Sequence, residues 1–203
     1  KNLNLAIIGD LIVDEYITCD PIGMSQEDPT MVVTPVNKIR FVGGSGIVAK
    51  HAANFGAKVN LFTVVGNDET GKFVKEDLNS YTNLRTELFV DENRPTTLKQ
   101  RFRSKGQSLL RVSHLHKDSI SAELQKKILD SISKIIKKLD LLVFSDFNYG
   151  CLPQNLVDKI ISLAKSNNVY LVADSQASSQ ISNICRFKNV DLLTPTEHEA
   201  RIS

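Results

Sequence analysis

Leu5-Ala6-Ile7-Ile8-Gly9-Asp10 (residues 5–10) is the stretch that decides the fold. A continuous apolar run ended by a glycine and an aspartate is typical of a strand that is buried on both faces, as in a parallel sheet. Further runs at 59–65, 141–144, 169–173 and 190–193 are also rich in apolar residues. We expect each of them to be a strand of the same sheet.

The segments between these runs are predicted to be helical. The clearest is 121–138, where the apolar residues recur at spacings of three and four, and Ser121 is a suitable N-cap. Shorter helices are expected at 46–55, 70–79 and about 153–166, and another begins near residue 197. Strands that alternate with helices predict an α/β fold with a doubly wound, mainly parallel sheet.

Residues 86–116 interrupt this rhythm. Apolar and polar residues alternate there, and Lys105-Gly106-Gln107 breaks the pattern, as between antiparallel strands with one solvated face. Residues 31–42 are rich in β-branched residues before a run of glycines. We expect lid segments at about 11–41 and 86–116, forming a small β lid from about 11–18, 31–41 and 87–113.

The composition indicates one globular domain, residues 1–203, with 41% hydrophobic and 24% charged residues. A net charge of +2 gives no support for a nucleic acid or membrane partner. Cys19, Cys151 and Cys185 are scattered, which favours free thiols in a reducing compartment. The start is too quickly polar for a signal peptide, so we expect a cytoplasmic protein. Because the sequence stops as a helix begins, we expect a domain truncated at its C-terminus.

Polar residues follow almost every predicted strand. In an open parallel sheet, ligands bind at the carboxyl ends of the strands, so this edge is the expected binding site. Short Asp and Ser side chains also cap helices, which is the alternative for each position alone. The positions are Asp10, Asp14, Gly43 to Gly46, Asn67, Asp68, Ser145, Asp146, Asp174, Ser175, Thr194 and Thr196.

Residues 44–49 match G-x-G-x-x-A, and Asp68 follows about 20 residues later, as in a dinucleotide-binding fingerprint. This keeps a nicotinamide-dependent enzyme as one alternative. Against it, Lys38 and Arg40 alternate with apolar residues in the preceding strand, which suits a half-exposed strand. The glycines are also explained by close packing of a helix on a sheet.

Residues 94–117 contain seven lysines and arginines and no acidic residue. Such a cluster predicts either a site for a phosphate or acidic ligand, or a solvated face of the lid. His114 and His116 would share a face of a strand, but two histidines without a third ligand do not indicate a metal site.

Several motifs together resemble the PfkB/ribokinase family of carbohydrate kinases, and most closely the kinase half of bifunctional heptose 7-phosphate kinase/adenylyltransferases. The resemblance covers the whole chain as the N-terminal two-thirds of a kinase domain, and implies a ribokinase-like fold. The motifs are Gly9-Asp10-Leu11-Ile12-Val13-Asp14, similar to G-D-x-x-x-D; Gly43-Gly44 with Val65-Gly66-Asn67-Asp68; Arg94 to Arg101; Ser145-Asp146-Phe147 with Gly150 and Leu152; and Leu193-Thr194-Pro195 with Glu199.

The resemblance implies phosphoryl transfer from ATP, with Mg²⁺, to a hydroxyl of a sugar or sugar phosphate. A compound like heptose 7-phosphate is among the substrates that it implies. It implies no metal ligand directly, and it places the catalytic base, an Asp in a G-x-G-D motif, beyond Ser203, so this chain alone is expected to be inactive. The implied substrate-binding residues are Asp14, Gly43, Gly44, Lys99 and Arg101. The implied nucleotide and magnesium residues are Thr196, Glu197, His198 and Glu199.

The chain departs from the family pattern at four positions: Ile47 replaces an Asn, Tyr149 a Lys, Gln176 a Lys and Thr196 an Asn. Each exchange removes a charge or an amide from the implied site. The alternative function is therefore a catalytically silent ribokinase-like module that binds a sugar or nucleotide or serves as a scaffold. A G-x-G-D motif in the following residues would favour the kinase.

The lid also suggests a homodimer. It carries apolar residues such as Phe89, Phe102 and Leu110 on a sheet too small to bury them alone. We expect two copies of the protein to associate through their lids.

Overall fold

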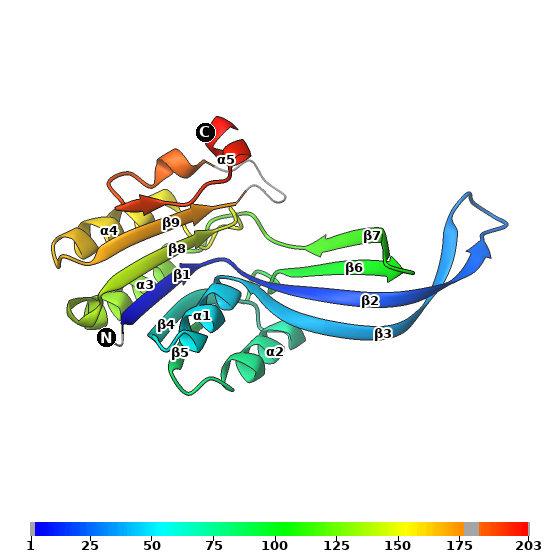
Figure 1. Ribbon diagram of the computed structural model, residues 1–203, viewed down its shortest axis with the longest axis horizontal. Helices are drawn as coiled ribbons and strands as arrows, with labels where there is room; N and C mark the ends of the chain where they lie inside the picture. Colours follow the sequence, from blue (N-terminus) through cyan, green and yellow to red (C-terminus); the bar gives the residue numbers. More distant parts are fainter. Residues whose placement is uncertain (1–2, 177–182, 203) are drawn as a thin grey trace.

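A six-stranded parallel sheet forms the body of the protein. The computed structural model describes residues 3–176 and 183–202. The strands lie in the order β10-β9-β8-β1-β4-β5, and every neighbouring pair is parallel (Figure 1). Their bounds are β1 (Asn4–Gly9), β4 (Lys58–Val65), β5 (Leu84–Val90), β8 (Leu141–Asp146), β9 (Tyr170–Ser175) and β10 (Leu192–Leu193).

Helices cover both faces of this sheet, which confirms the doubly wound prediction. Successive side chains of a strand point to opposite faces, so Leu5 and Ile7 of β1 enter one core, and Ala6 and Ile8 enter the other. The first core lies against α1 (Ser45–Asn54) and α2 (Glu69–Leu78), and the second against α3 (Ala122–Ile135) and α4 (Gln154–Lys165). The run at residues 5–8 is apolar throughout because both of its faces are buried.

The helix boundaries follow local signals in the sequence. The Ser121 hydroxyl accepts a hydrogen bond from Leu124 N at 3.2 Å, so the predicted N-cap is confirmed. α1 ends just before Gly56, which has a φ of +86°. A short helix, α5 (Glu197–Ile202), closes the described chain, and 3₁₀ turns lie at Ile136–Lys138 and Ile184–Arg186. No helix in the described ranges has the length and apolar character needed to cross a membrane.

A second sheet of four strands projects from the body, and we call it the lid (Figure 1). Its order is β3-β2-β6-β7, where β2 (Leu11–Met24) pairs antiparallel with β3 (Met31–Gly44) and parallel with β6 (Leu98–Ser104). β7 (Gln107–His114) pairs antiparallel with β6. β2 begins only two residues after β1 ends, so the first strand of the body leads directly into the lid.

The lid segment expected at 86–116 is wrong at its beginning. Residues 84–90 form β5, which pairs in parallel with β4 in the main sheet, and Phe89 packs against the core beside α3 and α4. β5 is the outermost strand of the sheet, and most of its side chains are only partly buried. Its sequence alternates for that reason, and alternation alone does not separate an edge strand from a lid strand.

The dinucleotide-binding alternative is also wrong. The strand before the glycines is β3, a lid strand antiparallel to β2, and not the parallel strand that this fingerprint requires. Asp68 caps α2, because its carboxylate accepts a hydrogen bond from Gly71 N at 2.7 Å. Its other oxygen accepts one from Thr96 N at 2.8 Å, in the segment before β6. The glycines serve close packing instead: Gly44 has a φ of +58°, and a Cβ there would lie 2.4 Å from the carbonyl oxygen of Asp10.

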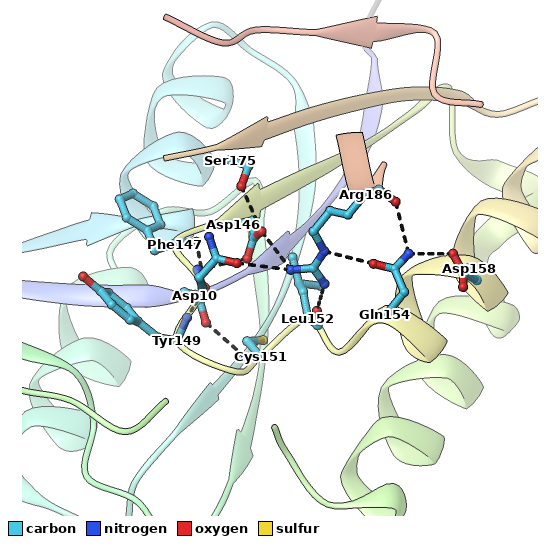
Figure 2. Close-up of polar contacts among 11 residues, drawn as sticks. Asp10, Asp146, Phe147, Tyr149, Cys151, Leu152, Gln154, Asp158, Ser175 and Arg186 are labelled. Carbon is cyan, nitrogen blue, oxygen red and sulfur yellow. Dashed lines mark hydrogen bonds and ion pairs between the residues drawn. The ribbon is translucent and has the colours of Figure 1, made fainter. Parts of the chain in front are cut away.

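Asp10 joins the end of β1 to the loop that follows β8 (Figure 2). Its buried carboxylate accepts hydrogen bonds from the backbone N–H groups of Phe147 at 2.8 Å, Tyr149 at 3.2 Å and Cys151 at 3.1 Å. Its own carbonyl accepts one from Ser45 N at 2.9 Å, at the start of α1. One residue therefore fixes the carboxyl ends of β1 and β8 and the start of α1 relative to one another.

Asp10 should make stability depend on pH. The pKa of Asp10 is raised to about 6: burial raises it most, the charge of Asp146 adds to the rise, and the three N–H groups oppose it. Because the folded pKa lies above the usual 3.8, protonation of Asp10 stabilises the folded state. This stabilisation is complete below about pH 4 and is lost as the pH rises through 6. Relative to Asp10→Asn, the full-length protein should lose about 2 kcal/mol of unfolding free energy between pH 4.5 and 7.5.

The measurement is urea unfolding of both proteins across that range. Asp191→Asn is the control: the Lys165 ammonium and the Leu171 N–H lower the pKa of Asp191, so it titrates below this window. Its curve should run parallel to that of the unsubstituted protein. A parallel curve for Asp10→Asn would show that Asp10 does not titrate as described.

Candidate functional site

A cavity of about 320 Å³ lies at the carboxyl edge of the main sheet, where the lid joins the body. All five residues predicted to bind substrate line it: Asp14, Gly43, Gly44, Lys99 and Arg101. The wall on the body side includes Ser145 at the end of β8 and Asp174 at the end of β9. The cavity thus lies at the edge where an open α/β sheet binds ligands.

Three hollows of larger volume lie elsewhere among the described residues. One of about 380 Å³ lies between α2 and β5, one of about 520 Å³ lies on the lid around Tyr16 and Phe41, and one of about 400 Å³ lies between α3 and α4. The first contains Asn67 and Asp68, which follow β4, but none of the three contains a predicted substrate-binding or nucleotide-binding residue. The smaller cavity is therefore the candidate site, because it alone of the four contains the predicted substrate-binding residues.

Asp14 and Arg101 form an ion pair inside this cavity. Asp14 lies on β2 and Arg101 on β6, and Asp14 Oδ1 accepts from Arg101 Nη2 at 3.0 Å and from Nε at 3.3 Å. Asp14 Oδ2 lies on the other side, 3.0 Å from where a Cβ on Gly43 would be. The missing side chain at Gly43 leaves room beside this oxygen. The pair presents a carboxylate oxygen and a guanidinium group side by side.

Lys99 brings a second positive charge to the cavity. Its ammonium nitrogen lies 5.8 Å from the ring centroid of Phe147 and 5.2 Å from that of Tyr149. The two rings are nearly parallel, with centroids 6.2 Å apart. Lys99 belongs to β6 of the lid, whereas both rings belong to the loop after β8, so this contact connects the lid with the body.

Three of the four departures from the family pattern affect this cavity. Ile47 and Gln176 line it directly. Tyr149 is buried and contributes one of the two rings beside Lys99. Ile47 replaces an amide by an alkyl chain, Gln176 replaces an ammonium group by an amide, and Tyr149 replaces an ammonium group by an aromatic ring. The exchanges therefore change which ligand groups the cavity can hydrogen-bond.

A second buried carboxylate, Asp146, lies behind the cavity. Its Oδ2 accepts from Arg186 Nη1 at 3.0 Å and from Ser175 Oγ at 3.1 Å (Figure 2). Burial raises the pKa of Asp146, and the charge of Arg186 opposes that rise. Arg186 also donates to the carbonyl of Leu152 and to Gln154 Oε1. These bonds hold the ends of β8 and β9 and the start of α4 in place.

The four residues predicted to bind nucleotide and magnesium do not line the cavity. Thr196 and Glu199 form a capping box on α5: Glu199 Oε2 accepts from Thr196 N and from Thr196 Oγ1, each at 2.8 Å, and Glu199 N donates to Thr196 Oγ1 at 3.3 Å. Glu197 pairs with Arg201 at 2.6 Å, and His198 is exposed. This segment is connected to the cavity through Thr194, whose hydroxyl donates to Asp174 Oδ1 at 3.1 Å.

The described residues do not make up a complete magnesium site. They contain no group of three or more His, Cys, Asp or Glu side chains placed to hold a metal ion. The carboxylate of Glu199 is buried and caps a helix. A hard cation such as Mg²⁺ requires several oxygen ligands, which this part of the chain does not supply by itself.

Sequence reasoning does not reveal the roles of two residues that organise the site. The sequence places Asp10 after a strand and within the G-D-x-x-x-D motif, but its structural role depends on N–H groups more than 130 positions away along the chain. Arg186 lies in a short 3₁₀ turn with no motif around it. The available signals concern Asp10 alone: it follows the first strand directly and lies in the G-D-x-x-x-D motif.

Comparison with known sequences identifies the family. Residues 3–203 match the model of the pfkB family carbohydrate kinases. The chain is 32% identical over 203 residues to the bifunctional protein HldE of Aliarcobacter butzleri, and 31% identical over 195 residues to that of Helicobacter pylori strain HPAG1. These matches cover 99% and 96% of this chain but only 41% of each relative, so the chain spans less than half the length of the relatives.

Solved structures show the same fold. A carbohydrate kinase from Agrobacterium tumefaciens superposes with a TM-score of 0.75 at 16% identity, covering 98% of this chain and 62% of that one. Arabidopsis thaliana ribokinase, solved with ribose and ATP, superposes with a TM-score of 0.68 at 16% identity, covering 100% of this chain and 62% of that one. The fold is ribokinase-like, and the chain belongs to the pfkB family of carbohydrate kinases.

Proposed function

We propose that this chain provides the sugar-binding side of the active site in an ATP-dependent kinase that phosphorylates a hydroxyl of a sugar or sugar phosphate. The observation that carries the proposal is the convergence of Asp14, Gly43, Gly44, Lys99 and Arg101 on one cavity at the strand ends. Phosphoryl transfer depends mainly on positioning and on neutralisation of charge. A cavity that holds the acceptor sugar against the body of the enzyme meets the first of these needs.

Asp14 is the group that would hold the sugar hydroxyls. A carboxylate accepts hydrogen bonds from hydroxyl groups, and Asp14 Oδ2 faces the open backbone at Gly43. Arg101 fixes the carboxylate through the other oxygen, Oδ1, at 3.0 Å. The ion pair therefore orients the acceptor and leaves one oxygen directed toward the sugar.

Lys99 and Arg101 favour a substrate that already carries an anionic group. Both line the cavity, and both belong to β6 of the lid. Arginine and lysine together match the oxygens of a phosphate, the first as a planar fork and the second as a point charge. A sugar phosphate, including a heptose 7-phosphate, is therefore the substrate class that this side of the cavity fits.

The nucleotide side would come mainly from the rest of a longer protein. The relatives extend well beyond the matched region, and residues 196–199 would supply only one border of the ATP and Mg²⁺ site. The catalytic base and the groups that stabilise the transferred phosphoryl group are expected beyond Ser203. A kinase that uses ATP in this way would work in the cytoplasm, which fractionation of the native cells would test.

The alternative is a catalytically silent module that binds a sugar or nucleotide or serves as a scaffold. It is favoured by Ile47, which lines the cavity where the family pattern has an amide. A sugar hydroxyl facing this side chain would lose a hydrogen bond, at a cost of about 1–3 kcal/mol. Sugar binding without ATP turnover in the full-length protein would identify the silent module.

Asp14→Ala in the full-length protein should raise the KM for the sugar about ten- to hundredfold, because a hydrogen bond to a charged group contributes about 1.5–3 kcal/mol. Binding of ATP should change less than about twofold, since Asp14 lies on the sugar side. Steady-state kinetics over a panel of sugars and sugar phosphates, with ATP binding measured separately, gives both quantities.

Asp20→Ala is the matched control, because Asp20 is an exposed aspartate on the same strand and does not line the cavity. It should leave both quantities unchanged. An equal loss of sugar and ATP binding in Asp14→Ala, or a large fall in its melting temperature, would mean that Asp14 is a structural residue.

A homodimer through the lid is part of this proposal. Ile39 and Phe41 lie on the same face of the lid as Asp14 and Tyr16, and they are 48% and 54% exposed. A second copy seated on this face would cover the hollow around Tyr16 and would close the outer side of the sugar cavity. The residues that first suggested the dimer do not lie on this face. Phe89 belongs to β5 of the main sheet and packs against its core. Leu110, which is 56% exposed, lies with Phe102 on the opposite face of the lid, in register with Ile17.

Light scattering of the full-length protein should give a dimeric mass. Phe41→Asp should dissociate the dimer, because it would bury a charge in the contact. Leu110→Asp, the control on the other face, should leave the dimer intact. A monomeric mass for the unsubstituted protein would rule out the dimer, and dissociation by Leu110→Asp alone would assign it to the opposite face.

A further inference from the structure

The loop from Phe147 to Cys151 lies between the buried core and the candidate substrate site. The carboxylate of Asp10 accepts hydrogen bonds from three backbone N–H groups of this loop: Phe147 at 2.8 Å, Tyr149 at 3.2 Å and Cys151 at 3.1 Å. Arg94 also binds the loop: its guanidinium group donates to the carbonyl of Tyr149 at 3.1 Å and, outside the loop, to that of Asp118 at 2.7 Å. The loop is therefore fixed by charged groups that accept from its N–H groups and donate to its carbonyl.

Close packing gives this loop little room to shift. Gly150 has a φ of +88°, and a Cβ there would lie only 2.1 Å from the carbonyl oxygen of Asp118. Asp10 is 4% exposed and does not line the candidate cavity. It cannot touch a substrate there directly. Any effect of Asp10 on substrate must pass through the loop that it holds.

The loop presents two aromatic rings to Lys99. The ring centroids lie 5.8 Å (Phe147) and 5.2 Å (Tyr149) from the ammonium nitrogen, within the range of cation–π attraction. A lysine side chain has a flexible stem and loses considerable rotamer freedom when it is fixed in one place. Rings on a rigid loop reduce this freedom before a ligand arrives, so the ammonium group is held in advance at the cavity wall.

We propose that Asp10 is a positioning residue of the substrate site: by holding the backbone of Phe147 and Tyr149, it directs their rings at Lys99 and so fixes where the site presents this positive charge. The inference rests on the proposed function, in which Lys99 binds an anionic group of the substrate. It adds that the affinity for that group depends on a buried carboxylate that the substrate never contacts.

The test is a double-mutant cycle between Asp10 and Lys99 in the full-length protein, with inorganic phosphate as the probe. Binding of phosphate, and separately of ATP, is measured by titration calorimetry. Lys99→Met should weaken phosphate binding about tenfold. Asp10→Asn should weaken it about three- to tenfold, because the loop rings no longer hold the ammonium group.

The decisive result is non-additivity. If Asp10 acts through Lys99, Asp10→Asn should have almost no further effect on phosphate binding once Lys99 is methionine. A merely structural role would weaken phosphate and ATP binding together and would add to the effect of Lys99→Met. Additive effects, or unchanged phosphate binding in Asp10→Asn, would overturn the inference.

A second variant guards against misfolding of Asp10→Asn. Replacing Phe147 and Tyr149 together by leucine removes the ring faces but keeps Asp10 and its backbone partners, and it should weaken phosphate binding as Asp10→Asn does. Asp191→Asn is the matched control: its carboxylate also accepts a backbone N–H, from Leu171 at 2.8 Å, but it lies at the opposite edge of the sheet. It should not change phosphate binding.

The outcomes also separate this inference from the proposed function. Unchanged phosphate binding in Lys99→Met would mean that the proposed anionic substrate is wrong, and the inference would fall with it. Weaker binding in Lys99→Met together with normal binding in the double leucine variant would leave the proposed function intact and would overturn the positioning role alone.

Discussion

The hydrogen bonds between the buried carboxylate of Asp10 and the N–H groups of residues 147–151 are the interaction on which the rest of the structure depends. β1 and β8 are neighbours in the sheet but lie far apart along the chain. At their ends the regular ladder stops, and the backbone of the next loop needs other partners. Asp10 supplies them, and the loop then closes the wall of the candidate cavity.

Residues 9–11 are also where the backbone passes from the body into the lid. A Cβ on Gly9 would lie 1.8 Å from the carbonyl oxygen of Ser145, so the end of β1 must be free of a side chain. Beyond it, β2 runs outward and carries Asp14 over the strand ends. The body therefore forms the floor of the cavity and the lid forms its outer wall. Contacts such as Lys99 with Phe147 set how these two parts meet.

Much of the fold could be predicted because it depends on local patterns. The apolar run at 5–8 predicts a buried strand, and Ser121 predicts the start of α3. The pattern does not identify β5 correctly, because an edge strand of the main sheet and a strand of the lid are both half-exposed and both alternate. Whether the second face of such a strand is buried depends on which elements pack against it, and a local sequence pattern does not contain that information.

The candidate site was only partly accessible from sequence for a similar reason. Asp14, Gly43 and Gly44 could be named because they lie in motifs, and the cavity brings them together. Asp10 and Arg94 also lie in motifs, but their supporting roles could not be predicted. These two residues and Arg186 act on backbone groups that are distant in sequence. The capping box of Thr196 and Glu199 was likewise not predicted, because the family motif that contains these residues implies a ligand-binding role for them.

The departures at Ile47, Tyr149 and Gln176 become meaningful only in this setting. Tyr149 does not simply remove a lysine, because its ring now lies beside the ammonium group of Lys99, a cation contributed by the lid. The positive charge of the site is then carried by a strand of the lid and supported by the body. Such an arrangement is compatible with phosphoryl transfer, which requires correctly placed charges more than any particular side chain.

The central claim is that residues 1–203 hold the sugar side of a kinase site whose phosphate side lies elsewhere in the protein. Its most direct test is sugar-dependent ATP turnover by the full-length protein and by residues 1–203 alone, across a panel of sugars and sugar phosphates. The account predicts turnover by the full-length protein with at least one sugar phosphate, and none by residues 1–203. Turnover by purified residues 1–203 would contradict the account, because it would place the catalytic groups within the part of the chain described as the sugar side.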